Sequence, residues 1–251
     1  EEDGVFDDRT LAAGAVHTTV AVVAYPRISN LDEFQPLKNV PGLRLLWARS
    51  PADLGGLKPT DWVVLPGSKA TAADLAWLRA QGLDQAIAQH AGQGGAVLGI
   101  CGGLQMLGEA LIDTAGIDGN APGLGLLPLV KAFEPEKMLR SNEFSFASSL
   151  EGGWQSLAGV RASGYEIRHG RTQPHAGLPA PAVALRNAAG EAVGWQSGQV
   201  LGVYAHGLFE QPAVLKALFG QSGRSLDAVC DGLADFIDLH FQPGRLAGLI
   251  G

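Results

Sequence analysis

The residue best placed for chemistry in this 251-residue chain is Cys101, which lies in the segment Gly99-Ile-Cys-Gly-Gly103. This segment fits Gly-x-nucleophile-x-Gly, the sharp turn between a buried strand and a helix. An apolar run over Ala96–Ile100 precedes it, and a helix is expected over Gly103–Leu111. A thiol at a helix N-terminus is favoured as the thiolate. The pattern therefore predicts a cysteine nucleophile, although a small buried residue at a tight turn would give the same letters.

A cysteine nucleophile needs an acid/base partner that is near in space, and His206 is the histidine that fits. It follows the apolar run Val200–Tyr204 and therefore sits at the carboxyl end of a strand, the edge where open α/β sheets bind ligands. A direct site role for His169 stays open. The other histidines are expected to be structural, at helix ends or in loops: His17, His90, His175 and His240.

Backbone amides near Cys101 are expected to stabilise the oxyanion of a carbonyl under attack. The N–H of Gly102 is one donor, and Gly67, in the turn Pro66-Gly67-Ser68, is expected to supply the second. Gln105, on the first helical turn after Cys101, either contacts the substrate or is a polar residue of the helix surface. Cys230 recurs with apolar residues at helical spacing and is expected to be a core residue without chemistry.

Strand and helix signals alternate along the first part of the chain, which predicts an α/β fold with a mostly parallel central sheet flanked by helices. Strands are expected at 15–25, 43–47, 61–65, 96–100 and 200–204, and helices at 71–89, with a weak point at Gly82, and at 103–111, 212–219 and 225–240. Residues 123–199 break into shorter strand-like pieces, at 126–133, 143–146, 160–168, 182–186 and 192–196. The acidic residues 1–14 are expected to be a linker, and residues 15–251 one domain.

Composition excludes several classes of protein. The chain is 46% hydrophobic and 17% charged with a net charge of −7, which argues against nucleic acid or an anionic membrane as main partner. No apolar run is long enough for a membrane-spanning helix, and no secretory signal is seen. Two cysteines do not make a disulfide framework, so a reducing cytoplasm is expected. No metal site is expected.

The segment Gly99–Gln105, with His206 about a hundred residues later, resembles the class I, triad-type glutamine amidotransferases. Four further segments resemble the C-terminal amidotransferase domain of the cobyric acid synthase family: Pro26–Phe34, Leu65–Lys69, Gly164–Thr172 and Tyr204–Phe209. The resemblance implies the flavodoxin-like fold of that class. It also implies that Cys101 attacks the side-chain amide of glutamine and that His206 is the acid/base.

The resemblance further implies a larger enzyme of cobalamin biosynthesis that activates corrin carboxylates with ATP and amidates them with ammonia from glutamine. The substrate would be adenosylcobyrinic acid a,c-diamide and the product adenosylcobyric acid. The chain has no Gly-x-x-x-x-Gly-Lys-Ser/Thr segment, so ATP, Mg²⁺ and most corrinoid contacts are expected in an N-terminal synthetase domain in cis, and no cofactor in this one.

The sequence departs from the class I pattern after the histidine. Many of these enzymes carry a glutamate two residues later that orients the imidazole, and here that position is Leu208. Glu166, in a strand-like segment, is the favoured replacement. Glu210 is the second candidate, and a Cys–His dyad is the third hypothesis.

Three rival interpretations remain. The first is a related amidotransferase, from cobyrinic acid a,c-diamide synthase or a lipid II-amidating complex. The second is a catalytically inert docking module with the same fold, and the third is a thiol hydrolase. An intact pair of Cys101 and His206 argues against the docking module.

Overall fold

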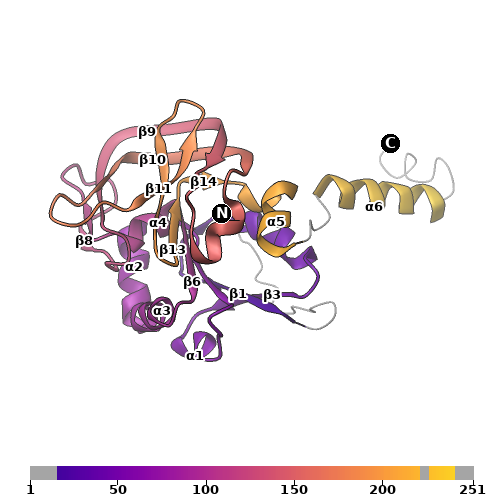
Figure 1. Ribbon diagram of the computed structural model, residues 1–251, viewed down its shortest axis with the longest axis horizontal. Coiled ribbons are helices and arrows are strands. Elements are labelled where there is room, and N and C mark those ends of the chain that lie inside the picture. The colour runs from indigo at the N-terminus through magenta and orange to yellow at the C-terminus, as the bar shows by residue number, and fades with distance from the viewer. Residues whose placement is uncertain (1–15, 221–225, 241–251) are drawn as a thin grey trace, which may run out of the picture.

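The computed structural model describes residues 16–220 and 226–240, and its centre is a parallel sheet (Figure 1). Five strands lie in the order β3, β1, β4, β6, β13 and all run parallel. Their bounds are Leu43–Ala48, Thr18–Val23, Trp62–Leu65, Ala96–Ile100 and Val200–Val203. The last three are buried at every residue, as expected for strands that are covered on both faces.

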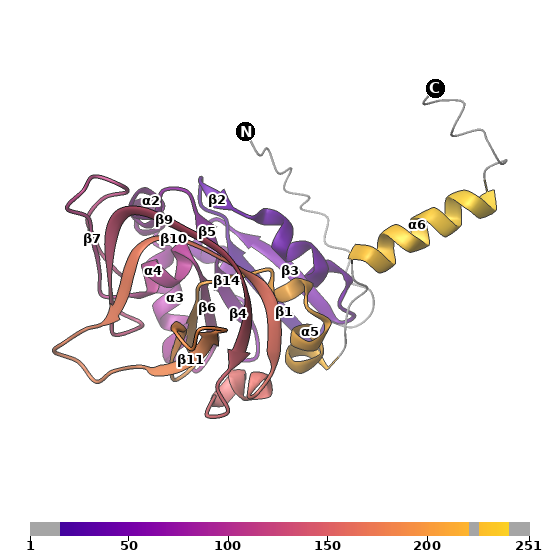
Figure 2. The same ribbon diagram turned by 90° about the horizontal axis from the view of Figure 1, so that it is seen from above.

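Helices cover both faces of these strands (Figure 2). On β4, Leu65 meets the short helix α4 at Gly103, whereas Trp62, on the opposite face, packs against Trp154 and Phe219. Phe219 ends α5 and Trp154 belongs to the 3-10 helix η2. The helical elements are α1 (Pro51–Leu54), α2 (Thr71–Ala80), α3 (Leu83–Gly92), α4 (Gly102–Leu107), α5 (Pro212–Phe219), α6 (Leu226–His240), η1 (Leu31–Asn39), η2 (Gly152–Leu157) and η3 (Leu208–Glu210).

The second half of the chain extends the same sheet with antiparallel strands, in the order β13, β12, β11, β9, β10, β14. Their bounds are β9 Leu129–Phe146, β10 Arg161–Pro174, β11 Ala182–Asn187, β12 Ala192–Ser197 and β14 Ala205–His206. Two short strands, β7 (Ala110–Ile112) and β8 (Ala121–Pro122), pair beside β9. A separate pair joins β2 (Ile28–Ser29) to β5 (Gly67–Ser68). The predicted α/β class with a mostly parallel centre and a strand-rich second half is confirmed.

Two predicted helices and two predicted strand segments differ from the structure. The helix expected over residues 71–89 is two helices, because Gly82 adopts a left-handed conformation with φ 75°. The helix expected over 103–111 ends at Leu107, and residues 110–112 form β7 instead. The pieces expected at 126–133 and 143–146 belong to one strand, β9, whose long hairpin with β10 is closed by cross-strand pairing that local sequence does not reveal.

Two predictions fall on residues that the structure does not describe. Residues 1–14, expected to be a linker, are among them, and so is the side chain of Cys230 in α6. Within the described residues, α6 exposes Leu233, Phe236 and Leu239. None of the described helices is long and apolar enough to cross a bilayer.

Candidate active site

Cys101 stands in the turn between β6 and α4 with a backbone conformation that L-residues rarely adopt. Its φ is 51° and its ψ is −104°. A side chain at Gly99 would come within 2.7 Å of Gly103, so the two glycines allow the strand and the helix to meet back to back. Strained conformations of this kind persist where the surroundings enforce them, and they concentrate at functional sites. The predicted nucleophile turn is therefore present in the fold.

The thiol of Cys101 is 8% exposed and donates a hydrogen bond to the carbonyl of Ile167, at 3.2 Å. Ile167 belongs to β10, so the antiparallel half of the sheet forms the wall opposite the nucleophile. The nucleophilic form of a cysteine is the thiolate, so an acid/base group must hold the thiol proton when the sulfur attacks.

The structure places His206 at the same edge, fully buried at the end of β14. Its ring stacks on Tyr165, with centroids 5.0 Å apart. Burial lowers the pKa of His206, but the contacts with Cys101 and Glu33 raise it more, to about 10. Nε2 has no hydrogen-bond partner among the described residues. This nitrogen is therefore the one that can exchange a proton with Cys101.

The other ring nitrogen, Nδ1, faces the 3-10 helix η1 near the start of the chain. Glu33 Oε2 lies 3.2 Å from Nδ1 and Asn30 Nδ2 lies 3.0 Å from it. Glu33 also accepts a hydrogen bond from the N–H of Gly207, at 3.4 Å. Neither Glu33 nor Asn30 was a predicted site residue. The signal available in the sequence was their presence in Pro26–Phe34, one of the segments that carried the family resemblance.

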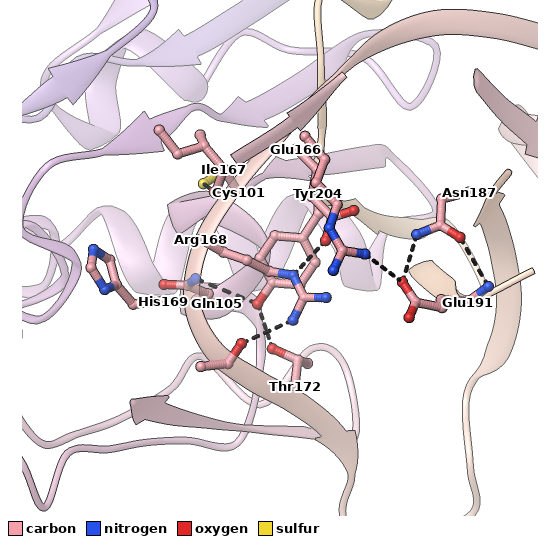
Figure 3. A network of polar contacts seen from close by, with 12 residues as sticks. Cys101, Gln105, Glu166, Ile167, Arg168, His169, Thr172, Asn187, Glu191 and Tyr204 are labelled. Carbon is pink, nitrogen blue, oxygen red and sulfur yellow. Dashed lines mark hydrogen bonds and ion pairs between the residues drawn. The ribbon is translucent and has the colours of Figure 1, made fainter. Parts of the chain in front are cut away.

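Glu166 does not fill the position that the sequence suggested for it. In the antiparallel pair of β10 and β14, Tyr165 lies opposite His206 and Glu166 lies opposite Ala205. Successive side chains of a strand point to opposite faces, so Glu166 is turned away from the imidazole. Its carboxylate pairs with Arg168 instead, at 2.5 Å (Figure 3). The prediction that Glu166 contacts His206 is therefore wrong. The neighbouring residue of β10, Tyr165, occupies the position opposite the histidine.

The turn expected to supply the second oxyanion donor lies against the nucleophile turn. Tyr25 donates to the carbonyl of Pro66, which ties the turn to the end of β1. A Cβ at Gly102 would come within 2.8 Å of the amide nitrogen of Ser68. Gly67 lies opposite Ser29 in the β2–β5 pair, and the N–H of Lys69 donates to the carbonyl of Arg27. In an antiparallel pair, successive N–H groups point alternately toward the partner strand and away from it. The N–H of Gly67 therefore points toward β2, and the N–H of Ser68 points away from β2.

Gln105 sits in a buried polar layer behind Cys101 (Figure 3). Its Oε1 accepts from Thr71, at 3.2 Å, and its Nε2 donates to the hydroxyl of Tyr204, at 3.4 Å. That hydroxyl lies 2.5 Å from Thr172 Oγ1, and burial raises the pKa of Tyr204 to about 12. The amide of Gln105 is thus held in a fixed orientation at the wall of the cleft.

Lys131 is a buried cation beside this layer. It donates to the carbonyl of His169 and lies over the rings of Phe133 and Tyr204, 5.2 and 5.7 Å from their centroids. Burial, followed by the neighbouring Arg168, lowers its pKa to about 8. The contact fixes the backbone of the β10 segment that faces Cys101.

A cleft of about 440 Å³ opens over Cys101, within the usual range for small-molecule sites. It is lined by Ser29, Asn30, Ser68, Lys69, Thr71, Cys101, Gly102, Gln105, Ile117, Asp118, Phe133, Lys137, Ile167, Arg168 and His169. Cationic side chains and one carboxylate, Asp118, thus share a single cavity with the nucleophile.

The histidines that were expected to be structural are not among the residues that line the cleft. His90 is buried, with Nε2 3.0 Å from the carbonyl of Asp61, and His175 Nδ1 accepts from the N–H of Gly177. His17 and His240 are exposed. Across residues 16–220 and 226–240, no three His, Cys, Asp or Glu side chains come together as a metal site.

Comparison with solved structures agrees with the fold. A structure described as a glutamine amidotransferase superposes on 79% of this chain and 98% of its own, with TM-score 0.56 and 19% identity. The PurLQS structure from Thermotoga maritima covers 81% of this chain and 98% of its own, with TM-score 0.52 and 15% identity. These likenesses support the fold alone.

Sequence relatives are much closer. Cobyric acid synthases of Polaromonas naphthalenivorans and Paracidovorax citrulli are 64% and 65% identical, over 100% and 97% of this chain. The chain spans about half the length of these curated relatives, 52% and 50%. The family model of the CobB/CobQ-like glutamine amidotransferase domain matches residues 19–214. The chain therefore belongs to the family of CobB/CobQ-like glutamine amidotransferase domains.

Proposed function

We propose that this domain hydrolyses glutamine through a thioester on Cys101 and that His206 carries the protons. The observation that supports this most is the strained Cys101 at the β6–α4 turn, which lines the cleft and contacts a buried imidazole whose Nε2 has no hydrogen-bond partner among the described residues. In the first step Nε2 takes the thiol proton and Sγ bonds to the side-chain amide carbon of glutamine. The imidazolium then protonates the leaving nitrogen, which departs as ammonia. Water, deprotonated by the same nitrogen, releases glutamate and restores the thiol.

Two backbone amides are suited to the oxyanion that forms in both steps. One is the N–H of Gly102, the residue after the nucleophile. The other is the N–H of Ser68, which points away from the β2–β5 pair and toward Gly102. Gly67, the residue predicted for this role, is one position away, and its absent side chain keeps the turn close to the imidazole. Donors preorganised in this way are worth about 2.7–4 kcal/mol each in related sites.

The remainder of the cleft suits a zwitterionic amino acid. Lys69, Lys137 and Arg168 can face an α-carboxylate, while Asp118 can face an α-ammonium group. Gln105, whose own amide is bound by the protein, shapes the wall rather than presenting a free donor. Free glutamine is therefore the proposed substrate.

For the longer polypeptide we propose the activity of its relatives. Ammonia would pass to an ATP- and Mg²⁺-dependent synthetase domain in cis, which amidates carboxylates of adenosylcobyrinic acid a,c-diamide to give adenosylcobyric acid. The basis is the name that the relatives share and their roughly double length. The amidotransferase half needs no cofactor of its own for the proposed chemistry.

Covalent labelling tests the proposal. A chloroketone analogue of glutamine is expected to modify Cys101 stoichiometrically, as read by peptide mass spectrometry, and free glutamine is expected to protect it. Cys101→Ser should abolish both labelling and ammonia release, while Cys230→Ser should leave the rate within a few-fold. Equal loss in the two folded variants would overturn the assignment. Stable folding without labelling would instead favour a docking module, and ester hydrolysis without glutaminase would favour a thiol hydrolase.

A further inference from the structure

The position that carries the orienting carboxylate in many class I enzymes is occupied by Leu208, which is buried and apolar. Glu210, two residues further on, is exposed at the end of η3. Glu166 is committed to Arg168 on the other face of β10. Within the part of the chain that the structure describes, none of these three side chains hydrogen-bonds the imidazole of His206, whose Nδ1 faces Asn30 and Glu33.

We propose that Glu33, from η1 in the first part of the chain, is the residue that positions His206 for proton transfer. This inference rests on the proposed function, because positioning matters only if His206 moves protons. Glu33 lies 173 positions before His206 in sequence, and its carboxylate is 3.2 Å from Nδ1. A carboxylate there fixes the tautomer with the proton on Nδ1 and leaves Nε2 as the base that faces Cys101.

The carboxylate of Glu33 does more than meet the ring. The same oxygen, Oε2, accepts from the N–H of Gly207 at 3.4 Å, so η1 is tied to the backbone directly after the histidine. The second oxygen, Oε1, is buried without a hydrogen-bond partner among the described residues. A buried carboxylate with one unsatisfied oxygen is costly unless an opposite charge compensates it. The imidazolium of His206 is the cation that the site provides.

The rest of η1 is built to hold Glu33 in place. Phe34 and Leu37 are fully buried, and Phe34 packs against Trp47 and Phe209, both with ring centroids 5.9 Å away. Phe209 follows His206 by three residues. The packing therefore anchors η1 to the same segment that its carboxylate contacts.

Asn30 directly precedes η1 and has a left-handed backbone conformation, with φ 57°. Its carbonyl accepts from the N–H of Glu33 at 3.2 Å, which sets the direction of the glutamate. When Nδ1 of His206 carries a proton, it cannot accept a hydrogen bond from Asn30 Nδ2. The side-chain amide of Asn30 must then turn its oxygen toward the ring, an orientation that exchanges two atoms of similar density.

Other titratable groups lie near His206, and their positions decide which substitution can serve as a control for Glu33. Cys101 faces it from the β6–α4 turn, Tyr165 stacks on it from β10, and Glu210 lies on η3 near Gly207. Asp32 is the neighbour of Glu33 in η1, but its side chain is exposed. Asp32→Asn is therefore a matched substitution that removes one carboxylate from the same helix without touching the imidazole.

The experiment compares Glu33→Gln, Glu33→Asp and Asp32→Asn in the longest natural polypeptide that contains this chain. Glu33→Gln is expected to lower kcat for glutamine hydrolysis by about 10- to 1,000-fold with KM nearly unchanged, in line with the loss of a third triad member elsewhere. Glu33→Asp should recover part of kcat, because the charge remains and only one methylene is lost. Asp32→Asn should stay within about two-fold of the wild type.

A second readout needs no glutamine. The rate at which iodoacetamide alkylates Cys101, followed by peptide mass spectrometry, rises with pH as the thiolate forms. In Glu33→Gln its midpoint is expected to move up by about one pH unit or more, because the imidazolium that pairs with the thiolate has lost its carboxylate. Unchanged kcat and an unchanged midpoint in a folded Glu33→Gln would overturn the proposal.

The two readouts separate the inference from the proposed function. A wild type that neither releases ammonia nor reacts with the glutamine analogue, but still shows the alkylation shift in Glu33→Gln, would refute the function and keep the positioning contact. If Glu33→Gln does not fold, ¹⁵N chemical shifts of His206 in the wild type decide the matter, measured at a pH above about 10 where the ring is neutral. A neutral ring with its proton on Nδ1 supports the proposal, and a neutral ring with its proton on Nε2 overturns it.

Discussion

Two buried carboxylates, Glu33 and Glu166, lie near the same histidine in different regions of the molecule. Glu33 is in η1, and its carboxylate meets His206 Nδ1. Glu166 is in β10, directly beside β14, and its carboxylate meets Arg168 (Figure 3). Glu166, in the strand that pairs with the strand of His206, does not contact the imidazole, whereas Glu33, which lies outside the sheet, does. Strand alternation turns Glu166 to the other face, whereas a helix that packs across the end of the sheet can aim a side chain at it.

The largest expected effect comes from removing the imidazole of His206, which Glu33 contacts and Glu166 does not. His206→Ala should lower glutamine hydrolysis by about 10⁴- to 10⁶-fold, since acid and base are lost together. Adding Glu33→Gln to His206→Ala should cost almost nothing further, because Glu33 acts through the ring. Adding Glu166→Gln to His206→Ala should lower kcat by the same factor as Glu166→Gln lowers it in the wild type. Double-mutant cycles of kcat measure both couplings, and a coupled Glu166 would erase the contrast.

The next effect concerns stability. Glu166→Gln leaves Arg168, only 13% exposed, without its charged partner. A loss of about 1–3 kcal/mol in the free energy of unfolding is expected, and a melting temperature lower by several degrees. The rate at a temperature where the variant is folded should fall far less than in Glu33→Gln. A stable Glu166→Gln with a large loss of kcat would return Glu166 to the catalytic site.

The pH dependence of stability should also separate the two carboxylates. The pKa of His206 is raised to about 10 in the folded chain, against about 6.5 when unfolded. The stability from this group is full below about pH 6.5 and is lost as the pH rises through about 10. Lys131 acts in the opposite sense, because burial lowers its pKa to about 8 in the folded chain. Its charged form destabilises the fold at low pH, and this destabilisation disappears as the pH rises above the pKa of lysine in the unfolded chain.

The informative quantity is therefore the difference between variants. Urea unfolding between pH 6.5 and 10 should show a weaker alkaline loss in Glu33→Gln than in the wild type. Glu166→Gln should keep the wild-type profile. Three identical profiles would mean that Glu33 does not stabilise the imidazolium.

The smallest effect is expected at Glu210. Its pKa is raised by desolvation of the carboxyl group and by the neighbouring carboxylates of Glu33 and Asp32. Glu210→Gln removes this repulsion without removing a contact to the ring, so the rate should stay within about three-fold of the wild type and stability should rise slightly. Steady-state ammonia release and thermal melting measure the two. A loss of kcat as large as that of Glu33→Gln would show that Glu210 shares the positioning role.

The nucleophile turn could be predicted from the sequence because its physical requirements are local. Gly99, Cys101 and Gly103 are adjacent in the chain, and a buried strand that ends in glycines leaves few alternatives. His206 followed from the same reasoning, as a histidine at the end of an apolar strand. The central strands β4, β6 and β13 were predictable because burial on both faces makes each a short continuous apolar run.

Other features depended on contacts between distant segments. The length of β9 was missed because its middle, with Lys137 and Arg140, is polar and stays in the strand only through pairing with β10. The end of the helix after Cys101 was also missed, since residues 110–112 pair with β9. Local preference carries no information about either partner.

The sequence by itself predicted the amidotransferase fold of this chain, and it identified the residues proposed here as nucleophile and base, Cys101 and His206. Only the tertiary structure decided which carboxylate meets the imidazole. Glu33 and His206 are 173 positions apart, and no periodicity links a 3-10 helix to a strand end. The choice between Glu33 and Glu166 depends on the face to which β10 turns Glu166. That face is set by pairing with β14 and not by the residues around Glu166.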